Sequence, residues 1–121
     1  MAETRTKAKT KTKTKTKTET AIVNEIRVRC STMGGKCYKL HGSQYSHVGA
    51  PDLIGYCLET PFVCEVKKSG KFASPAQRYE LHQWRKIGVL AFVAHSADEF
   101  EQNLRSFSET IGEKLMPPDG A

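Results

Sequence analysis

Residues 52–67, DLIGYCLETPFVCEVK, decide the fold. Branched and aromatic side chains fill both halves of this stretch, and Glu59-Thr60-Pro61 separates the halves. Two such runs around a short polar connection predict a β-hairpin with antiparallel strands. A turn centred between Leu58 and Glu59 places Asp52 directly opposite Glu65.

The predicted hairpin gathers Asp52, Glu65 and Lys67 on one face, because side chains alternate along a strand. Two opposed carboxylates repel each other and add nothing to stability. A divalent cation removes the repulsion, and such oxygen ligands suit Mg²⁺ or Mn²⁺; Mg²⁺ usually takes only one or two protein carboxylates. The ion can activate water, and the lysine offers a further cation to a phosphate. The pattern therefore predicts metal-dependent phosphodiester hydrolysis.

A structural explanation competes for each of these residues, because a single acid or a Glu-x-Lys pair on a strand is usually solvated surface. The flanking residues favour a buried, central strand pair, where charges need a partner. These flanks are Leu53, Ile54, Val63, Cys64 and Val66.

Three motifs together resemble the VRR-NUC branch of the PD-(D/E)xK nuclease superfamily and, more distantly, archaeal-type Holliday junction resolvases. They are GAPDLIG at 49–55, VCEVK at 63–67 and SPAQ at 74–77. The similarity spans roughly residues 21–104, nearly the whole folded part. It implies a restriction-endonuclease-like α/β core with a central mixed sheet flanked by helices.

The resemblance also implies roles for individual residues. Asp52 and Glu65 become metal ligands, and Lys67 becomes the catalytic lysine. Glu25 matches an acid on the family's first helix and is a further candidate ligand, as is the backbone carbonyl of Val66. Gln77 matches a glutamine that follows the catalytic strand.

Two interpretations of Gln77 remain open. Ser74-Pro75-Ala76-Gln77 is a capping box with proline at the first helical position, which alone explains both polar residues. A helix beginning there would also point its N-terminus toward the phosphate.

The first twenty residues carry most of the basic charge. They hold seven basic and two acidic side chains, a net of +5, and the whole 121-residue chain has +6, so the remainder contributes +1. Alternating lysine and threonine leave nothing apolar to bury, so residues 1–18 are expected to be disordered. Such an arm suits DNA phosphates, although a solubility tail is the alternative. The candidate DNA contacts are Lys7, Lys9, Lys11, Lys13, Lys15 and Lys17, with Lys68 and Lys71 after the catalytic strand.

The remaining pattern predicts one nuclease domain over residues 19–111. Expected elements are a helix at 19–33, a strand at 36–40, a helix at 75–87, a strand at 89–94 and a final helix to about Ser108. From Gly112 the chain is expected to be loose. The four cysteines fit no zinc spacing and are expected to be free thiols. Without a secretion signal, we expect a protein that is not secreted and lies in the cytoplasm or wherever DNA is held, of bacterial or viral type.

These observations predict a Mg²⁺- or Mn²⁺-dependent endonuclease of branched DNA, including four-way junctions. Symmetric incision of two strands favours a homodimer, and the loop at 42–49 is expected beside the branch point. Three alternatives remain: a non-catalytic DNA-binding module on a nuclease-like scaffold, a less selective nuclease, and a site-specific enzyme. The last is disfavoured by the short core, which leaves little room for a base-reading element.

Overall fold

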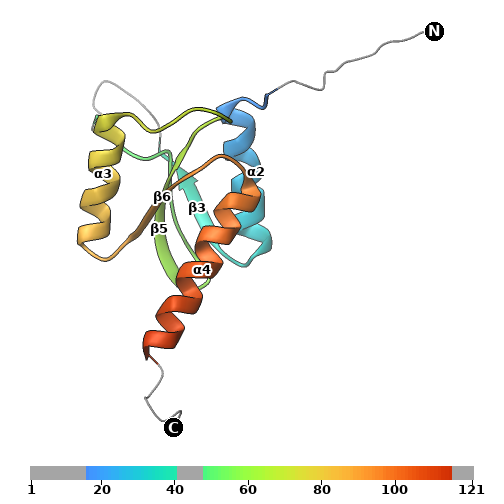
Figure 1. Ribbon diagram of the computed structural model, residues 1–121. Helices are drawn as coiled ribbons and strands as arrows, with labels where there is room; N and C mark the ends of the chain where they lie inside the picture. The colour runs from blue at the N-terminus through green and yellow to red at the C-terminus, as the bar shows by residue number, and fades with distance from the viewer. Residues whose placement is uncertain (1–15, 41–47, 116–121) are drawn as a thin grey trace, which may run out of the picture.

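A computed structural model describes residues 16–40 and 48–115. A four-stranded mixed sheet lies between helices (Figure 1). Across the sheet the order is β3 (Lys36–Lys39), β4 (Leu53–Cys57), β5 (Thr60–Val66) and β6 (Leu90–Ala94). The first two pairings are antiparallel and the last is parallel. This arrangement confirms the predicted α/β class with a central mixed sheet.

Helices α2 (Glu19–Thr32) and α4 (Ala97–Leu115) cover one face of the sheet, and α3 (Pro75–Lys86) covers the other (Figure 1). The larger core lies under α2 and α4, where three aromatic rings meet with centroids 5.2 to 6.3 Å apart. These rings belong to Phe62, Phe92 and Phe100. Arg29 joins the two helices at the surface, bonded to Asp98 and Glu101.

The smaller core lies under α3 and contains the buried residues Val63, Leu81 and Ala91. Trp84 and Val93 pack against it. The helix predicted at 75–87 and the strand predicted at 89–94 therefore both pack beside β5. Gly88 has a φ of +94° just after the helix, a conformation that glycine adopts without strain.

The hairpin turn is tighter than predicted. Leu58 and Glu59 alone form it, with φ of 51° and 58°, as a two-residue turn between twisted antiparallel strands requires. Thr60 and Pro61, predicted to lie in the connection, belong to β5. Proline is tolerated there because pairing with β6 begins one residue later, at Phe62, so no bond to β6 is lost.

The last helix is longer than predicted. We expected it to end near Ser108 and the chain to be loose from Gly112, but α4 continues to Leu115. Apolar residues recur at helical spacing through positions 100, 104, 107, 111 and 115, and an interior glycine costs a helix only about 1 kcal/mol. None of the helices in the part of the chain that the structure describes is long and apolar enough to cross a membrane.

The last three residues of the expected arm, 16–18, belong to the described part of the chain, and two of them contact α2. Residues 1–15 lie outside the described residues, but Thr18 is the N-cap of α2, and its hydroxyl accepts from the Ala21 amide at 3.1 Å. Lys17 is paired with Glu25 at 2.8 Å. All four cysteines are free thiols, as predicted.

Candidate active site

The register of the hairpin confirms the predicted apposition of the two acids. Leu53 pairs with Cys64 across β4 and β5, so the preceding residue, Asp52, lies opposite Glu65. The Asp52 carboxylate accepts a 2.8 Å hydrogen bond from the Val66 amide, which holds its side chain against β5. The Asp52 backbone carbonyl accepts from Leu40 at 2.8 Å, which ties this end of β4 to β3.

Glu65 is buried, with only 3% of its surface exposed. Its Oε2 accepts from Gln77 Nε2 at 2.9 Å and lies 3.6 Å from Lys67 Nζ. Its Oε1 is buried without a hydrogen-bond partner among the described residues. Burial and then the charge of Asp52 raise the pKa of Glu65 to about 8, although Lys67 opposes the shift. The carboxylate is therefore a costly group to keep charged without a further cation.

These features fit a divalent cation. An orphaned buried carboxylate oxygen beside a second acid is the donor set that Mg²⁺ or Mn²⁺ takes, with water and phosphate completing the shell. Within residues 16–40 and 48–115 no cluster of three acidic, histidine or cysteine side chains converges on a metal position. The candidate protein ligands are thus the pair Asp52 and Glu65. For Val66, the structure ties the amide, not the predicted carbonyl, to this pair.

Lys67 lies directly after β5, and its amide donates to Ala94 of β6 at 3.1 Å. This backbone bond continues the parallel strand pairing and fixes the backbone position from which the Lys67 side chain extends. The side chain is mostly buried, and its ammonium lies on the side of Oε2 of Glu65. Lys68 and Lys71, predicted to contact DNA, lie exposed in the following turn, which an amide-to-carbonyl bond between them closes.

The structure confirms the capping-box interpretation of Gln77 and adds a contact with Glu65. Its Oε1 accepts from the Ser74 amide at 2.8 Å and its own amide donates to the Ser74 hydroxyl at 3.2 Å, which completes the capping box. Its Nε2 donates to Glu65. The same side chain therefore starts α3 and orients the buried acid.

Gly49 allows the motif before Asp52 to pack against α3. Its φ is +85°, and a Cβ there would lie 2.6 Å from the Ala76 carbonyl oxygen, in the first turn of α3. We predict that Gly49→Ala lowers the free energy of unfolding by about 2 to 4 kcal/mol, because strain and overpacking add. Gly70→Ala is the matched control, since Gly70 has a φ of +82° and open space around it. Equal losses of stability in urea titrations of the two variants would contradict a packing role for Gly49.

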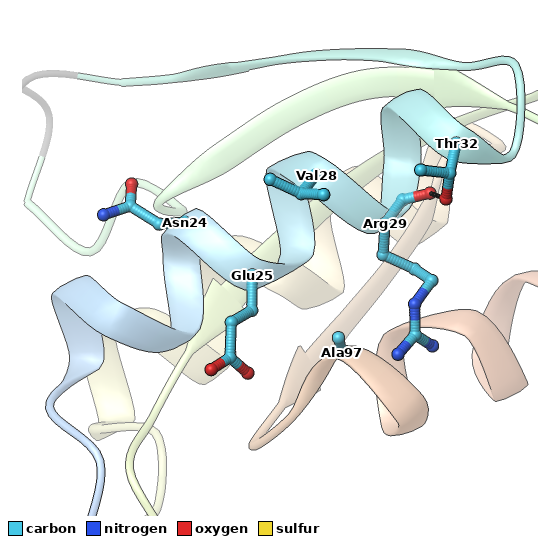
Figure 2. Close-up of a pocket in the computed structure, with 6 residues that line it drawn as sticks. All are labelled: Asn24, Glu25, Val28, Arg29, Thr32 and Ala97. Atoms are coloured by element: carbon cyan, nitrogen blue, oxygen red, sulfur yellow. Dashed lines mark hydrogen bonds between the residues drawn. The ribbon is translucent and has the colours of Figure 1, made fainter.

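The structure does not bring Glu25 to the acidic pair. Its carboxylate is paired with Lys17, and Figure 2 shows the side chain on the face of α2 that looks toward Ala97 at the start of α4. No contact in the described part of the chain joins Glu25 to Asp52 or Glu65. The match to the family's first-helix acid therefore gains no support from the geometry.

After burial and Asp52, the charge of another acid of α2, Glu19, is the smallest of the causes that raise the pKa of Glu65. We had not singled it out, but the sequence contains a signal. Ile22, Ile26 and Cys30 are buried at helical spacing, and the same stripe continued toward the N-terminus reaches Glu19.

Five of the candidate arm lysines, Lys7, Lys9, Lys11, Lys13 and Lys15, lie outside the described residues, as does most of the loop at 42–49. Lys17 is described, and its ammonium is taken by Glu25 at the surface. The arm's proposed DNA contacts therefore stay predictions.

Two solved structures share this architecture. One, titled "VRR_NUC domain", is 28% identical and has a TM-score of 0.60, and the match covers 72% of this chain and 94% of that one. The second, titled "VRR_NUC domain protein", is 22% identical and has a TM-score of 0.61, and the match covers 75% of this chain and 88% of that one. No family model and no curated protein matches the sequence.

The fold and the relatives that share it define a nuclease-like domain. The structural matches support assignment of the chain to the VRR-NUC family.

Proposed function

We propose that the protein is a divalent-metal-dependent endonuclease that hydrolyses phosphodiester bonds in branched DNA, including four-way junctions. The observation that carries the proposal is the buried Glu65 carboxylate, which faces Asp52 and keeps one oxygen without a partner among the described residues. A protein that only bound DNA would gain nothing from burying opposed acids.

Hydrogen bonds within the protein hold the two candidate metal ligands in position. The Val66 amide fixes the Asp52 carboxylate, and Gln77 fixes the Glu65 carboxylate. Lys67 holds an ammonium beside Glu65, where it can pair with a non-bridging phosphate oxygen as negative charge develops. A Mg²⁺ or Mn²⁺ ion held by the two acids would supply water activation and charge neutralisation.

A panel of labelled substrates tests the proposal. Four-way junctions, flapped, single-stranded and plain duplex DNAs of equal length are incubated with the protein in Mg²⁺ or Mn²⁺. The proposal predicts incision, with branched substrates cut faster than linear duplex. Binding of branched DNA without incision in either metal would favour the non-catalytic module, and equal rates on all substrates would leave a less selective nuclease.

We propose that the lysine-rich arm adds affinity without taking part in the chemistry. Deletion of residues 1–15 spares Thr18, which caps α2. The truncated protein should keep its cleavage rate at saturating DNA but bind more weakly, because each lost phosphate contact changes the log–log salt slope by about 0.9. Replacing the five lysines from Lys7 to Lys15 with glutamine keeps the length and should give the same slope. An unchanged slope in anisotropy titrations of both variants would refute this role.

We also propose a twofold homodimer, because paired incision of a junction needs two sites and the candidate site proposed here, Asp52 with Glu65, occurs once in each chain. The expected result is a dimer by sedimentation and nearly simultaneous nicks in opposed strands of a four-way junction. A monomer at assay concentration, with independent nicks at the two positions, would contradict the dimer.

A further inference from the structure

A hollow of about 360 Å³ lies between α3, the edge strand β6 and the turn after β5. We call it the α3–β6 groove. Its lining has an apolar part, formed by Phe72, Leu81 and Val93. The other part carries cationic or imidazole side chains, those of Arg78, Arg85 and His95. No acid is among the described residues that line it, so the groove suits an anion with an apolar body.

The apolar part has a buried floor and an open ring. Leu81 is buried in the smaller core and Val93 packs against it. Phe72, in contrast, is 80% exposed. A phenyl ring held at the mouth of a groove offers a flat face to a planar partner, and stacking removes apolar surface from water. The nucleobase is the planar partner that a nuclease substrate carries.

The cationic part is held in place by backbone carbonyls. Arg78 Nη1 donates to the Ala73 carbonyl and Arg85 Nε to the Ala91 carbonyl, each at 2.8 Å. A guanidinium has further N–H groups, which suit phosphate oxygens. The two arginines are seven residues apart on α3, which corresponds to about 10 Å along the helix.

His95 serves as a wall of the groove. Its Nδ1 lies 2.8 Å from Glu99 and its Nε2 lies 2.9 Å from the Lys71 carbonyl. Both ring nitrogens are therefore occupied. The contacts join the turn that carries Phe72 to the start of α4, and they fix the width of the groove at this end.

The groove lies next to Glu65 across the sheet. Val93, which lines the groove, pairs with Glu65 across β5 and β6, and Gln77, which bonds Glu65, directly precedes Arg78 on α3. The turn that carries Phe72 begins directly after Lys67 and leads into α3. A strand whose phosphate lies at Lys67 therefore has the groove as its neighbour.

We propose that the α3–β6 groove binds an unpaired nucleotide of the cleaved DNA strand, with its base stacked on Phe72 and its phosphate paired with Arg78, while Arg85 is left for a neighbouring phosphate of the same strand. This inference rests on the proposed function and names the part of the substrate that it selects. A base inside a duplex is stacked on both faces and cannot present a free face to Phe72, whereas an unpaired base can. The volume lies within the range of sites that hold small organic ligands.

Binding in chelator tests the inference without cleavage. A labelled duplex with a three-nucleotide single-stranded extension is compared with the blunt duplex by anisotropy. Phe72→Leu keeps an apolar side chain but removes the ring, and it should weaken binding of the extended duplex about tenfold while leaving the blunt duplex unchanged. Phe72→Tyr is the matched control and should bind both normally. Arg78→Gln should weaken binding of the extended duplex as well, because the amide retains a donor for Ala73 but not the charge.

Several outcomes would overturn the inference. They are equal binding of the extended duplex by Phe72→Leu and wild type, an equal loss on both DNAs, or equal affinity of the wild-type protein for the extended and the blunt duplex. If the protein cleaves no DNA but shows the predicted difference in binding, the groove inference stands and the proposed nuclease activity is wrong. If it cleaves DNA but shows no such difference, only the groove inference is wrong.

Discussion

Glu65→Gln should lower the rate of metal-dependent DNA incision by about a thousandfold or more, the scale of loss expected when a group that organises charge in the transition state is removed. The amide keeps the size of the side chain and can still meet Gln77, but it brings no negative charge to a cation. Asp52→Asn and Lys67→Ala should cause losses of similar size. Single-turnover incision at saturating Mn²⁺ measures the effect.

The matched control is Glu25→Gln. Glu25 lies on α2, is paired with Lys17, and makes no described contact with the acidic pair. Its substitution should leave the rate within about threefold of wild type, since surface substitutions rarely disturb a distant site. Near-normal turnover of Glu65→Gln would remove the proposed mechanism. A large loss in Glu25→Gln would instead restore this residue as a participant.

The metal-free protein should become less stable as pH rises from about 5 to about 8. The pKa of Glu65 is raised from 4.5 to about 8 in the folded state, so between these values the folded protein binds a proton that the unfolded chain has released. Stability falls with pH wherever the folded state binds more protons. The full effect of this residue is about 5 kcal/mol by that linkage.

Glu65→Gln isolates this contribution. The pKa of His95 is also raised, chiefly by its bond to the Lys71 carbonyl, so His95 adds stability at low pH that is lost as pH rises through its folded pKa. The wild-type protein and Glu65→Gln share the His95 contribution. The difference between the pH dependences of their free energies of unfolding, measured in urea, therefore reports Glu65. The variant should be the more stable protein at pH 8 in chelator. Parallel curves for the two proteins from pH 5 to 8 would show that Glu65 ionises normally.

Mn²⁺ should reverse the order of stability at pH 8, because a cation that binds the ionised acid stabilises the wild-type fold. The wild-type protein should gain stability in proportion to the logarithm of Mn²⁺ concentration above the dissociation constant. Glu65→Gln should gain much less. Identical gains in both proteins would place the cation elsewhere.

The acidic pair could be predicted from sequence because short-range rules determine it. Strand alternation and the turn at Leu58 and Glu59 fix which residues oppose each other, and β4 and β5 follow those rules. Likewise, the capping box at Ser74 fixed the start of α3, and with it the position of Gln77.

The role of Glu25 depends on the rotation of α2, which the family pattern does not give. Ile22 and Ile26 mark the buried side of the helix, and the Glu25 carboxylate is paired with Lys17 and not with Asp52 or Glu65. The α3–β6 groove was beyond sequence reasoning for a different reason. It depends on how the turn that carries Phe72 packs against His95, a contact between residues far apart in the chain.

Incision of a labelled four-way junction in Mn²⁺, repeated with excess chelator and with Asp52→Asn, is the most direct test of the proposed metal-dependent cleavage. We expect nicks near the branch point with wild-type protein in Mn²⁺, and none in chelator or with the variant. Intact junction after long incubation of folded wild-type protein in Mn²⁺, or equal nicking by Asp52→Asn, would contradict it.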